Sequence, residues 1–211
     1  MSHEHSDHAQ HPHSAQEWDE RYSSEARVWT DQVNPALARE AASLPPGRAL
    51  DVGSGEGADA RWLADHGWTV VAVDISQVAL DRAAAMDSRE TISWVRADLT
   101  VDPVPGGPFD LVSLQYFPLA VDRGEVLDRL FAALAPGGTL LMVAHDEASV
   151  REHGRNPDEY VQPAAVAARF GDRLEVQILE SLERGRPAGG AAAPRHMNDV
   201  VLKARRRPAA G

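Results

Sequence analysis

The segment that most constrains this chain is residues 48–57, which read Arg-Ala-Leu-Asp-Val-Gly-Ser-Gly-Glu-Gly. Its apolar start predicts a strand, and Gly53, Gly55 and Gly57 interrupt that strand before a helical pattern begins at Ala58. A strand that passes through alternating glycines into a helix brings bare main chain and the positive end of the helix dipole to a ligand. The segment therefore predicts a ligand-binding turn in an α/β protein.

Two classes of ligand fit this turn. Gly53, Gly55 and Ala58 satisfy the dinucleotide fingerprint G-x-G-x-x-G/A, so an NAD(P)-dependent oxidoreductase remains open. The carboxylates of Asp51 and Glu56 lie beside the turn and would repel a pyrophosphate. Residues further along the chain help to decide between these two classes of ligand.

Composition narrows the classes of protein. The chain has 211 residues, a net charge of −11 and no cysteine. We expect one soluble domain with a short appendage, and the acidic balance argues against a nucleic-acid partner. No apolar run reaches the ~18 residues of a membrane span, and no secretory signal is visible. Without cysteine there are no disulfides or thiolate sites, which fits a cytoplasmic protein.

Beyond the turn, strand-like and helix-like segments alternate. Helices are expected at 15–23, 35–43, 58–66, 77–87, 123–134 and 164–170. Strands are expected at 49–52, 68–73, 91–95, 109–117, 139–144, 174–182 and 197–204, with a turn at 136–138. This alternation predicts a doubly wound, Rossmann-like α/β sheet. The last two strands have no helix between them, so we expect them to pair antiparallel.

The chain divides into three expected parts. Residues 1–14 form a disordered, histidine-rich tail, residues 15–44 a helical cap, and residues 45–207 the ligand-binding domain. The histidines of the tail show no fixed ligand spacing, so we place no metal site there. Aromatic side chains of the cap, among them Trp18 and Tyr22, either pack on the core or cover the ligand pocket.

Acidic residues fall at or near the ends of three successive predicted strands, at Asp51, Asp74 and Asp98. In an open α/β sheet the ligand lies over the carboxyl ends of the strands. Asp74 is placed to accept both hydroxyls of a ribose, and Asp98 the exocyclic amine of an adenine. Asp51 faces the interior of the pocket, where it can meet an ammonium group. The set suits an adenosine that carries a cationic amino-acid arm.

Five motifs make residues 46–202 resemble the class I S-adenosylmethionine-dependent methyltransferases. They are Asp51-Val-Gly-Ser-Gly-Glu-Gly57, Val71-Ala-Val-Asp74-Ile-Ser76, Arg96-Ala-Asp98-Leu99, Phe109-Asp-Leu-Val-Ser-Leu-Gln115 and Leu134-Ala-Pro-Gly-Gly138. The resemblance implies a seven-stranded, mostly parallel sheet whose last strand is antiparallel. It also implies that residues 45–207 bind S-adenosyl-L-methionine and release S-adenosyl-L-homocysteine after methyl transfer.

The same resemblance implies where the cofactor lies. Asp74 would hold the ribose, Ala97 and Asp98 the adenine, and the loop Gly53–Gly57 the methionine arm. Gln115 would line the junction of cofactor and acceptor. The residues expected to bind the cofactor are Asp51, Gly53, Ser54, Gly55, Gly57, Asp74, Ile75, Ala97, Asp98, Leu99 and Gln115.

Within the class, the opening Gln16-Glu-Trp18-Asp-Glu-Arg21-Tyr22 and the segment at 183–186 look like the tellurite-resistance and thiopurine-type enzymes. Those enzymes methylate small molecules with soft nucleophiles, such as thiols and chalcogen oxyanions, and an arginine is thought to serve their acceptor site. The residues expected to line the acceptor site here are Trp18, Tyr22, Tyr116, Arg184 and Arg186. Neither nucleic acid nor membrane is an expected partner, and the oligomeric state stays open.

His145 is the candidate general base. It follows the strand predicted at 139–144, at the edge where the ligand is expected, and an unperturbed imidazole titrates near neutral pH. A thiolate needs no base, whereas a phenol, an alcohol or an amine often does. His145 is otherwise a loop residue bonded to main chain. Besides the oxidoreductase, a protein that binds the cofactor without catalysis also fits the sequence.

Overall fold

The computed structural model describes residues 14–152, 154–183 and 198–208. Seven strands of this part form one sheet in the order β3-β2-β1-β4-β5-β7-β6. The strands are β1 (Arg48–Val52), β2 (Thr69–Asp74), β3 (Ile92–Arg96), β4 (Phe109–Gln115), β5 (Leu134–His145), β6 (Leu174–Glu183) and β7 (Asn198–Arg206). The α-helices are α1 (Ala15–Ser24), α2 (Pro35–Ala41), α3 (Ala58–Asp65), α4 (Gln77–Met86), α5 (Gly124–Ala133), α6 (Glu147–Glu152) and α7 (Pro163–Phe170). Short 3₁₀ turns occupy Pro157–Glu159 and Gly171–Arg173.

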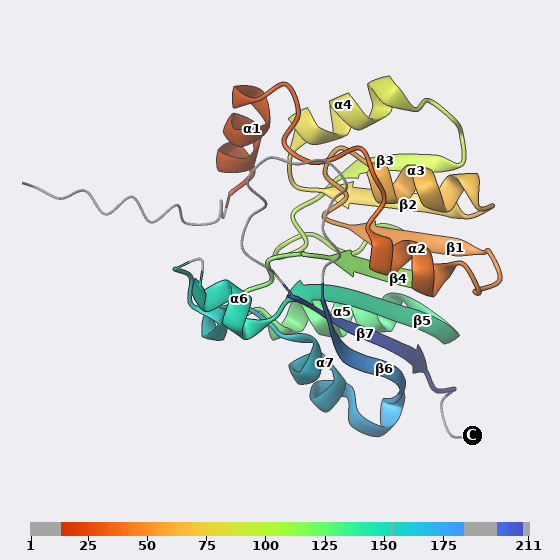
Figure 1. Ribbon diagram of the computed structural model, residues 1–211. Coiled ribbons are helices and arrows are strands. Elements are labelled where there is room, and N and C mark those ends of the chain that lie inside the picture. The colour runs from red at the N-terminus through yellow and green to blue at the C-terminus, as the bar shows by residue number, and fades with distance from the viewer. Residues whose placement is uncertain (1–13, 153, 184–197, 209–211) are drawn as a thin grey trace, which may run out of the picture.

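The sheet is parallel except for its last strand. β7 lies between β5 and β6 and runs antiparallel to both (Figure 1). This arrangement confirms the predicted Rossmann-like sheet with an antiparallel last strand. The parallel strands all end at one side of the sheet, which we call the carboxyl edge, and α1 and α6 lie beyond it (Figure 1). The antiparallel β7 begins at that same edge.

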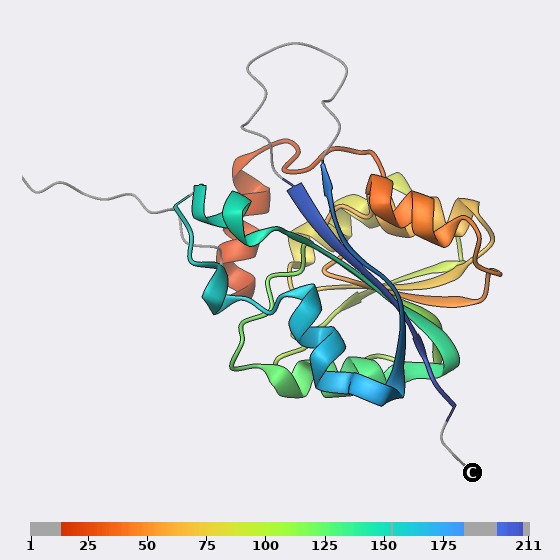
Figure 2. The same cartoon turned by 60° about the horizontal axis from the view of Figure 1, so that its bottom comes forward.

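Helices cover both faces of the sheet (Figure 2). On one face α5 and α7 bury Leu130 and Val166 against the strands, and on the other α2 and α3 bury Leu37 and Leu63. All four side chains are fully buried. Burial of one such side chain contributes about 1.5–3 kcal/mol, so the two cores hold the strands as a firm base for the carboxyl edge.

Local sequence signals explain where several helices begin. Ser14 and Glu17 form a reciprocal capping box at the start of α1. Asn34 is the N-cap of α2, and its side chain accepts a hydrogen bond from the main-chain N–H of Ala36. Pro35 is the first residue of the helix, a position that favours proline. Ser76 Oγ accepts from the N–H of Ala79 at 3.2 Å and starts α4. No helix of the described residues is long and apolar enough to cross a membrane.

The two central strand boundaries differ from the prediction. β4 ends at Gln115 instead of 117, because Tyr116 has a left-handed main chain with φ of 54°. β5 begins at Leu134 instead of 139, and the turn expected at 136–138 lies inside it, where the register of its pairing with β4 shifts. The glycines there therefore mark an irregular strand and not a connection.

The helix α6 was not predicted by the sequence pattern. It directly follows β5, and Asp146 Oδ1 accepts a hydrogen bond from the N–H of Ser149 at 2.7 Å. This short helix is held by a side-chain cap and not by an apolar stripe, which is why periodicity gave no sign of it.

Candidate functional site

The glycine loop between β1 and α3 has left-handed main chain at three positions. The φ values are 69° at Gly53, 53° at Gly55 and 80° at Gly57. A Cβ at Gly53 would lie 2.9 Å from the ring of Phe117, and one at Gly55 would lie 2.9 Å from Tyr22 Oη. Both the conformation and the close approach of these rings therefore require glycine. The predicted ligand-binding turn is a cradle of bare main chain walled by aromatic side chains.

Asp74, the last residue of β2, holds this loop. Its Oδ2 accepts a hydrogen bond from the N–H of Gly55, and its Oδ1 accepts one from the N–H of Ser76, both at 2.8 Å. The side chain is buried, and burial raises the pKa of Asp74 despite these bonds. A carboxylate oxygen can accept two hydrogen bonds, so Asp74 keeps acceptor capacity for a ligand.

Asp51 lies in β1, beside Ser113 of β4 in the strand register. It is buried, and burial together with the carboxylates of Asp59 and Asp74 raises the pKa of Asp51 well above its usual range. Three buried side-chain oxygens at this end of β1 and β4 have no hydrogen-bond partner among the described residues: Asp51 Oδ2, Ser54 Oγ and Gln115 Oε1. Such oxygens cost free energy when they are left unpaired, so the set favours a ligand with several donors.

The residues expected to hold an adenine lie after β3. The N–H of Ala97 donates to the main-chain oxygen of Asp74 at 3.1 Å, so this segment is tied to the end of β2. Asp98 Oδ1 accepts from the N–H and the hydroxyl of Thr100 and thereby caps its own turn. Ala97 and Leu99 are buried in the core, and Ile75 is half-buried with its main-chain oxygen bonded to Arg96.

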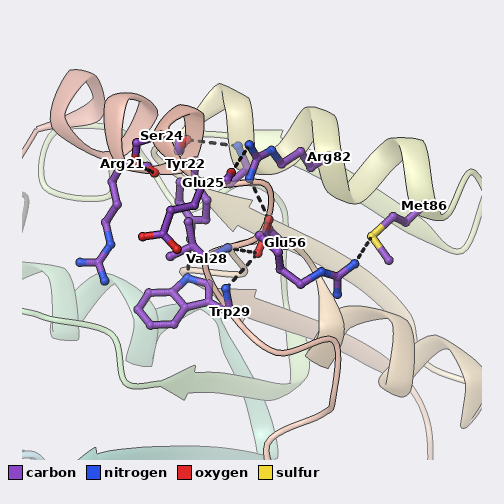
Figure 3. A network of polar contacts seen from close by, with 12 residues as sticks. Arg21, Tyr22, Ser24, Glu25, Val28, Trp29, Glu56, Arg82 and Met86 are labelled. Atoms are coloured by element: carbon purple, nitrogen blue, oxygen red, sulfur yellow. Dashed lines mark hydrogen bonds and ion pairs between the residues drawn. The ribbon is translucent and has the colours of Figure 1, made fainter.

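A network centred on Glu56 fastens the N-terminal segment over the glycine loop (Figure 3). Glu56 Oε2 accepts from the N–H groups of Val28 at 3.2 Å and Trp29 at 3.1 Å, and Oε1 forms an ion pair with Arg82 at 3.0 Å. Arg82 also donates to the main-chain oxygen of Glu25 at 2.8 Å. The sequence offered Glu56 only as a charge that repels pyrophosphate, because its partners lie in distant segments.

The aromatic side chains of this segment lie over the loop. Trp29 Nε1 donates to Tyr22 Oη at 2.8 Å, and the Trp18 and Tyr22 rings lie 5.9 Å apart. Burial raises the pKa of Tyr22, and the nearby carboxylate of Asp74 raises it further. The guanidinium of Arg21 lies over both indoles, 5.5 Å from Trp18 and 5.0 Å from Trp29. These contacts place Tyr22, which is buried, and Trp29, which is partly exposed, against the glycine loop.

A second cluster lies further along the carboxyl edge, at the ends of β4 and β5 and the start of β7. Tyr116 Oη donates to Asp199 Oδ2 at 2.7 Å, and His145 Nδ1 lies 3.2 Å from Asp199 Oδ1. The Tyr116 and His145 rings stack with centroids 4.5 Å apart. The sequence reasoning missed Asp199; its only signal was a carboxylate directly before the apolar run at residues 200–202.

The remaining predictions lie elsewhere. Arg184, Arg186 and the histidines of the tail lie outside the described residues. A surface hollow of about 630 Å³ between α5 and α7 is lined by Phe131, Arg173 and Arg206, among others. It lies at the edge opposite the glycine loop, where β7 ends, and none of the predicted site residues lines it.

Comparison with known proteins finds methyltransferases over part of the chain. A methyltransferase domain model matches residues 49–138. The demethylmenaquinone methyltransferase of Clavibacter sepedonicus is 32% identical over 143 residues, which are 65% of this chain and 58% of that protein. A probable thiol methyltransferase of Arabidopsis thaliana is 31% identical over 144 residues, 63% of each chain. The chain thus spans roughly half to two thirds of the length of these curated relatives.

Solved structures show the same fold. The N-methyltransferase NodS of Bradyrhizobium japonicum WM9, in complex with S-adenosyl-L-homocysteine, superposes with a TM-score of 0.66 at 21% identity, covering 89% of this chain and 95% of that one. TehB from Haemophilus influenzae gives a TM-score of 0.69 at 16% identity, covering 90% and 67%. The matching domain and the curated relatives are methyltransferases, and the fold is that of the class I S-adenosylmethionine-dependent methyltransferases.

Proposed function

We propose that the protein transfers a methyl group from S-adenosylmethionine to a small-molecule acceptor. The observation that carries this proposal is the set of three buried, unpartnered oxygens at Asp51, Ser54 and Gln115. An ammonium group brings three donors to such a set, whereas a pyrophosphate brings only acceptors. The oxygens therefore favour a ligand with a cationic amino-acid arm over a nicotinamide dinucleotide, whose fingerprint the glycine loop also satisfies.

The residues present fit this cofactor. Asp51 would meet its ammonium group, Gly53 and Gly55 would give its methionine arm access to the main chain, and Asp74 would accept the ribose hydroxyls. Ala97 and Asp98 would border the adenine. When bound, S-adenosylmethionine supplies an electrophilic methyl group on a positively charged sulfur.

The protein's own contribution is positioning and exclusion of water. An acceptor must lie in line with the carbon–sulfur bond, and holding it there removes much of the entropic barrier. Tyr22, Trp29 and Phe117 surround the glycine loop with aromatic surface, which keeps water away from the reacting atoms. No side chain of the protein has to bond to the methyl group during the transfer.

The acceptor class that we propose first is a thiol or a chalcogen oxyanion. The opening motif around Trp18 and the similarity to a thiol methyltransferase support it. Trp18, Tyr22 and Tyr116 would line the acceptor site, together with an arginine at Arg184 or Arg186. The net charge of −11 supports a small molecule over nucleic acid.

Calorimetric titration with S-adenosyl-L-homocysteine tests the cofactor. We expect one binding site per chain, and an affinity about tenfold or more lower in D51N, because the amide removes the charge that faces the ammonium group. D110N is the matched control: Asp110 also accepts from main chain, at Arg48, but at the opposite edge of the sheet. Binding of NAD or NADP in place of S-adenosyl-L-homocysteine would overturn the proposal.

Methyl transfer is tested with labelled cofactor and a panel of thiols, selenite, tellurite, phenols and amines. Label in any small-molecule product supports catalysis, and its identity gives the acceptor. If the protein binds S-adenosyl-L-homocysteine tightly but labels nothing in the panel, it is a cofactor-binding protein without this activity.

A further inference from the structure

Asp199 lies behind the imidazole of His145 at the carboxyl edge. The two residues face each other in the register of β5 and β7. The carboxylate of Asp199 is buried, whereas 24% of the His145 side chain is exposed. The imidazole therefore lies between a buried carboxylate and the open side of the site.

Both oxygens of this carboxylate have a partner. Oδ1 lies 3.2 Å from His145 Nδ1, and Oδ2 accepts from the hydroxyl of Tyr116 at 2.7 Å. An ionised carboxylate only accepts hydrogen bonds, so Nδ1 must carry the proton of the neutral imidazole. Nε2 is then the nitrogen with the lone pair. The bond from Tyr116 keeps the carboxylate from rotating away.

The main chain supports this arrangement. Tyr116 adopts a left-handed conformation with φ of 54°, which is rare for a bulky residue and persists only where surrounding contacts impose it. Here its N–H donates to the main-chain oxygen of Val143 at 2.8 Å, and its hydroxyl is bonded to Asp199. The strained residue thus presents its ring to His145 and its hydroxyl to the same carboxylate.

The pair lies beside the cofactor residues but not among them. β4 separates β1 from β5, and His145 lies four residues further along the strand direction than Leu141, which is level with Asp51, so the main chains of Asp51 and His145 lie roughly 16 Å apart. Gln115, at the end of β4, lies between the two. His145 is therefore on the side where an acceptor would approach.

We propose that Asp199 is a positioning residue that holds His145 with its proton on Nδ1, so that Nε2 accepts the proton of the methyl acceptor. This inference rests on the proposed methyl transfer and narrows its substrate class: it favours an acceptor whose reacting sulfur, oxygen or nitrogen carries a proton when it binds, such as a thiol, over a chalcogen oxyanion. The acceptor's lone pair forms the bond to the methyl carbon while the carbon–sulfur bond breaks and its electrons stay on sulfur. The acceptor's proton moves to Nε2 of His145 and from there to solvent.

The first test needs no cofactor and no activity. In protein labelled with ¹⁵N-histidine, the nitrogen shifts at a pH where the imidazole is neutral distinguish the two tautomers, and H145Q identifies the signal. We expect Nδ1–H in the wild type. In D199N the amide can donate to Nδ1, so we expect a shift toward Nε2–H. A wild-type imidazole with its proton on Nε2 would overturn the inference, whether or not any variant folds.

D146N is the matched control. Asp146 is the next residue to His145, but its side chain caps α6 by accepting from the N–H of Ser149, which asparagine also does. The tautomer of His145 should be the same in D146N as in the wild type. A change in D146N as large as that in D199N would mean that the local charge, and not the bond to Asp199, decides the tautomer.

The second test separates two kinds of acceptor. For a phenol that is protonated at the assay pH, D199N should lower kcat by about 100-fold, the usual lower range of a general base. For an aryl thiol that is already ionised, kcat should stay within about threefold, and the affinity for S-adenosyl-L-homocysteine should not change. Equal losses for both acceptors would overturn the positioning role. A wild type that methylates neither acceptor would count against the proposed function, while the tautomer would still decide the role of Asp199.

Discussion

The two sides of the candidate site are built in different ways. On the cofactor side, Asp51 and the glycines that follow it lie within seven residues of sequence, and the next partner, Asp74, ends the adjacent strand. On the acceptor side, Asp199 meets His145 and Tyr116 across separations of 54 and 83 residues. The cofactor side is formed by a short sequence motif and its main chain. The acceptor side exists only because β7 inserts beside β5.

The largest effect should come from removing the carboxylate that holds the loop. D74A leaves the N–H groups of Gly55 and Ser76 without an acceptor, and each unpaired group costs about 1–3 kcal/mol. We expect the free energy of unfolding in urea to fall by about 2–5 kcal/mol, and the affinity for S-adenosyl-L-homocysteine to fall about tenfold or more. D110A, at the opposite edge, should lose stability but keep affinity. Unchanged affinity in D74A would show that the cofactor side does not depend on this carboxylate.

The free energy of unfolding should also depend on pH, through a buried carboxylate on the cofactor side. Burial raises the pKa of Asp59 from 3.8 to about 6, so between these values the folded protein keeps a proton that the unfolded chain releases. Stability should therefore fall as the pH rises through this window. D59N cannot ionise but still accepts from the N–H of Asn34. We expect it to match the wild type near pH 4 and to exceed it by about 1–3 kcal/mol above pH 7. A stability difference that is constant with pH would contradict this.

A smaller effect is expected on hydrogen exchange in the N-terminal segment that lies over the glycine loop. E56Q replaces the carboxylate, whose Oε2 accepts from the N–H groups of both Val28 and Trp29, with a neutral amide. Both hydrogen bonds then lose their charge assistance, and hydrogen exchange at these two amides should become about tenfold faster. E25Q is the control, because Glu25 contacts Arg82 through its main-chain oxygen. Equal protection in E56Q and E25Q would mean that Glu56 does not hold the segment.

The smallest effect should come from the acceptor side. Y116F removes the bond to Asp199 and should lower the free energy of unfolding by about 0.5–1.5 kcal/mol. The affinity for S-adenosyl-L-homocysteine should stay the same, as measured by titration. If this affinity falls as much in Y116F as in D74A, the cofactor side and the acceptor side are energetically coupled and are not independent parts of the site.

The sequence predicted most of the fold because each element carries its own signal. Ser76 and Pro35 mark helix starts, and the strands show their own apolar runs. The end of β4 was not predictable, because nothing in the residue type of Tyr116 announces a left-handed main chain. The start of β5 at Leu134 was hidden by the glycines that follow it.

The residues of the candidate site also divide into those that the local sequence predicts and those that it does not. Asp51 and Asp74 were found because strand ends and glycines place them by local rules. Glu56 and Asp199 were not given their roles, because both depend on which distant segment lies beside them. Asp199 becomes a partner of His145 only through the register of two strands, which pairs these residues from 54 positions apart in the sequence.

Glu56 belongs to the glycine loop, yet its carboxylate fastens residues 28 and 29 above that loop. If binding at the loop depends on the position of Glu56, then order at residues 28 and 29 and affinity at the loop are linked, and each changes the other by the same factor. A change that weakens the two bonds to residues 28 and 29 would then lower that affinity. The N-terminal segment would in this way adjust the affinity of the loop through the main-chain N–H groups of residues 28 and 29.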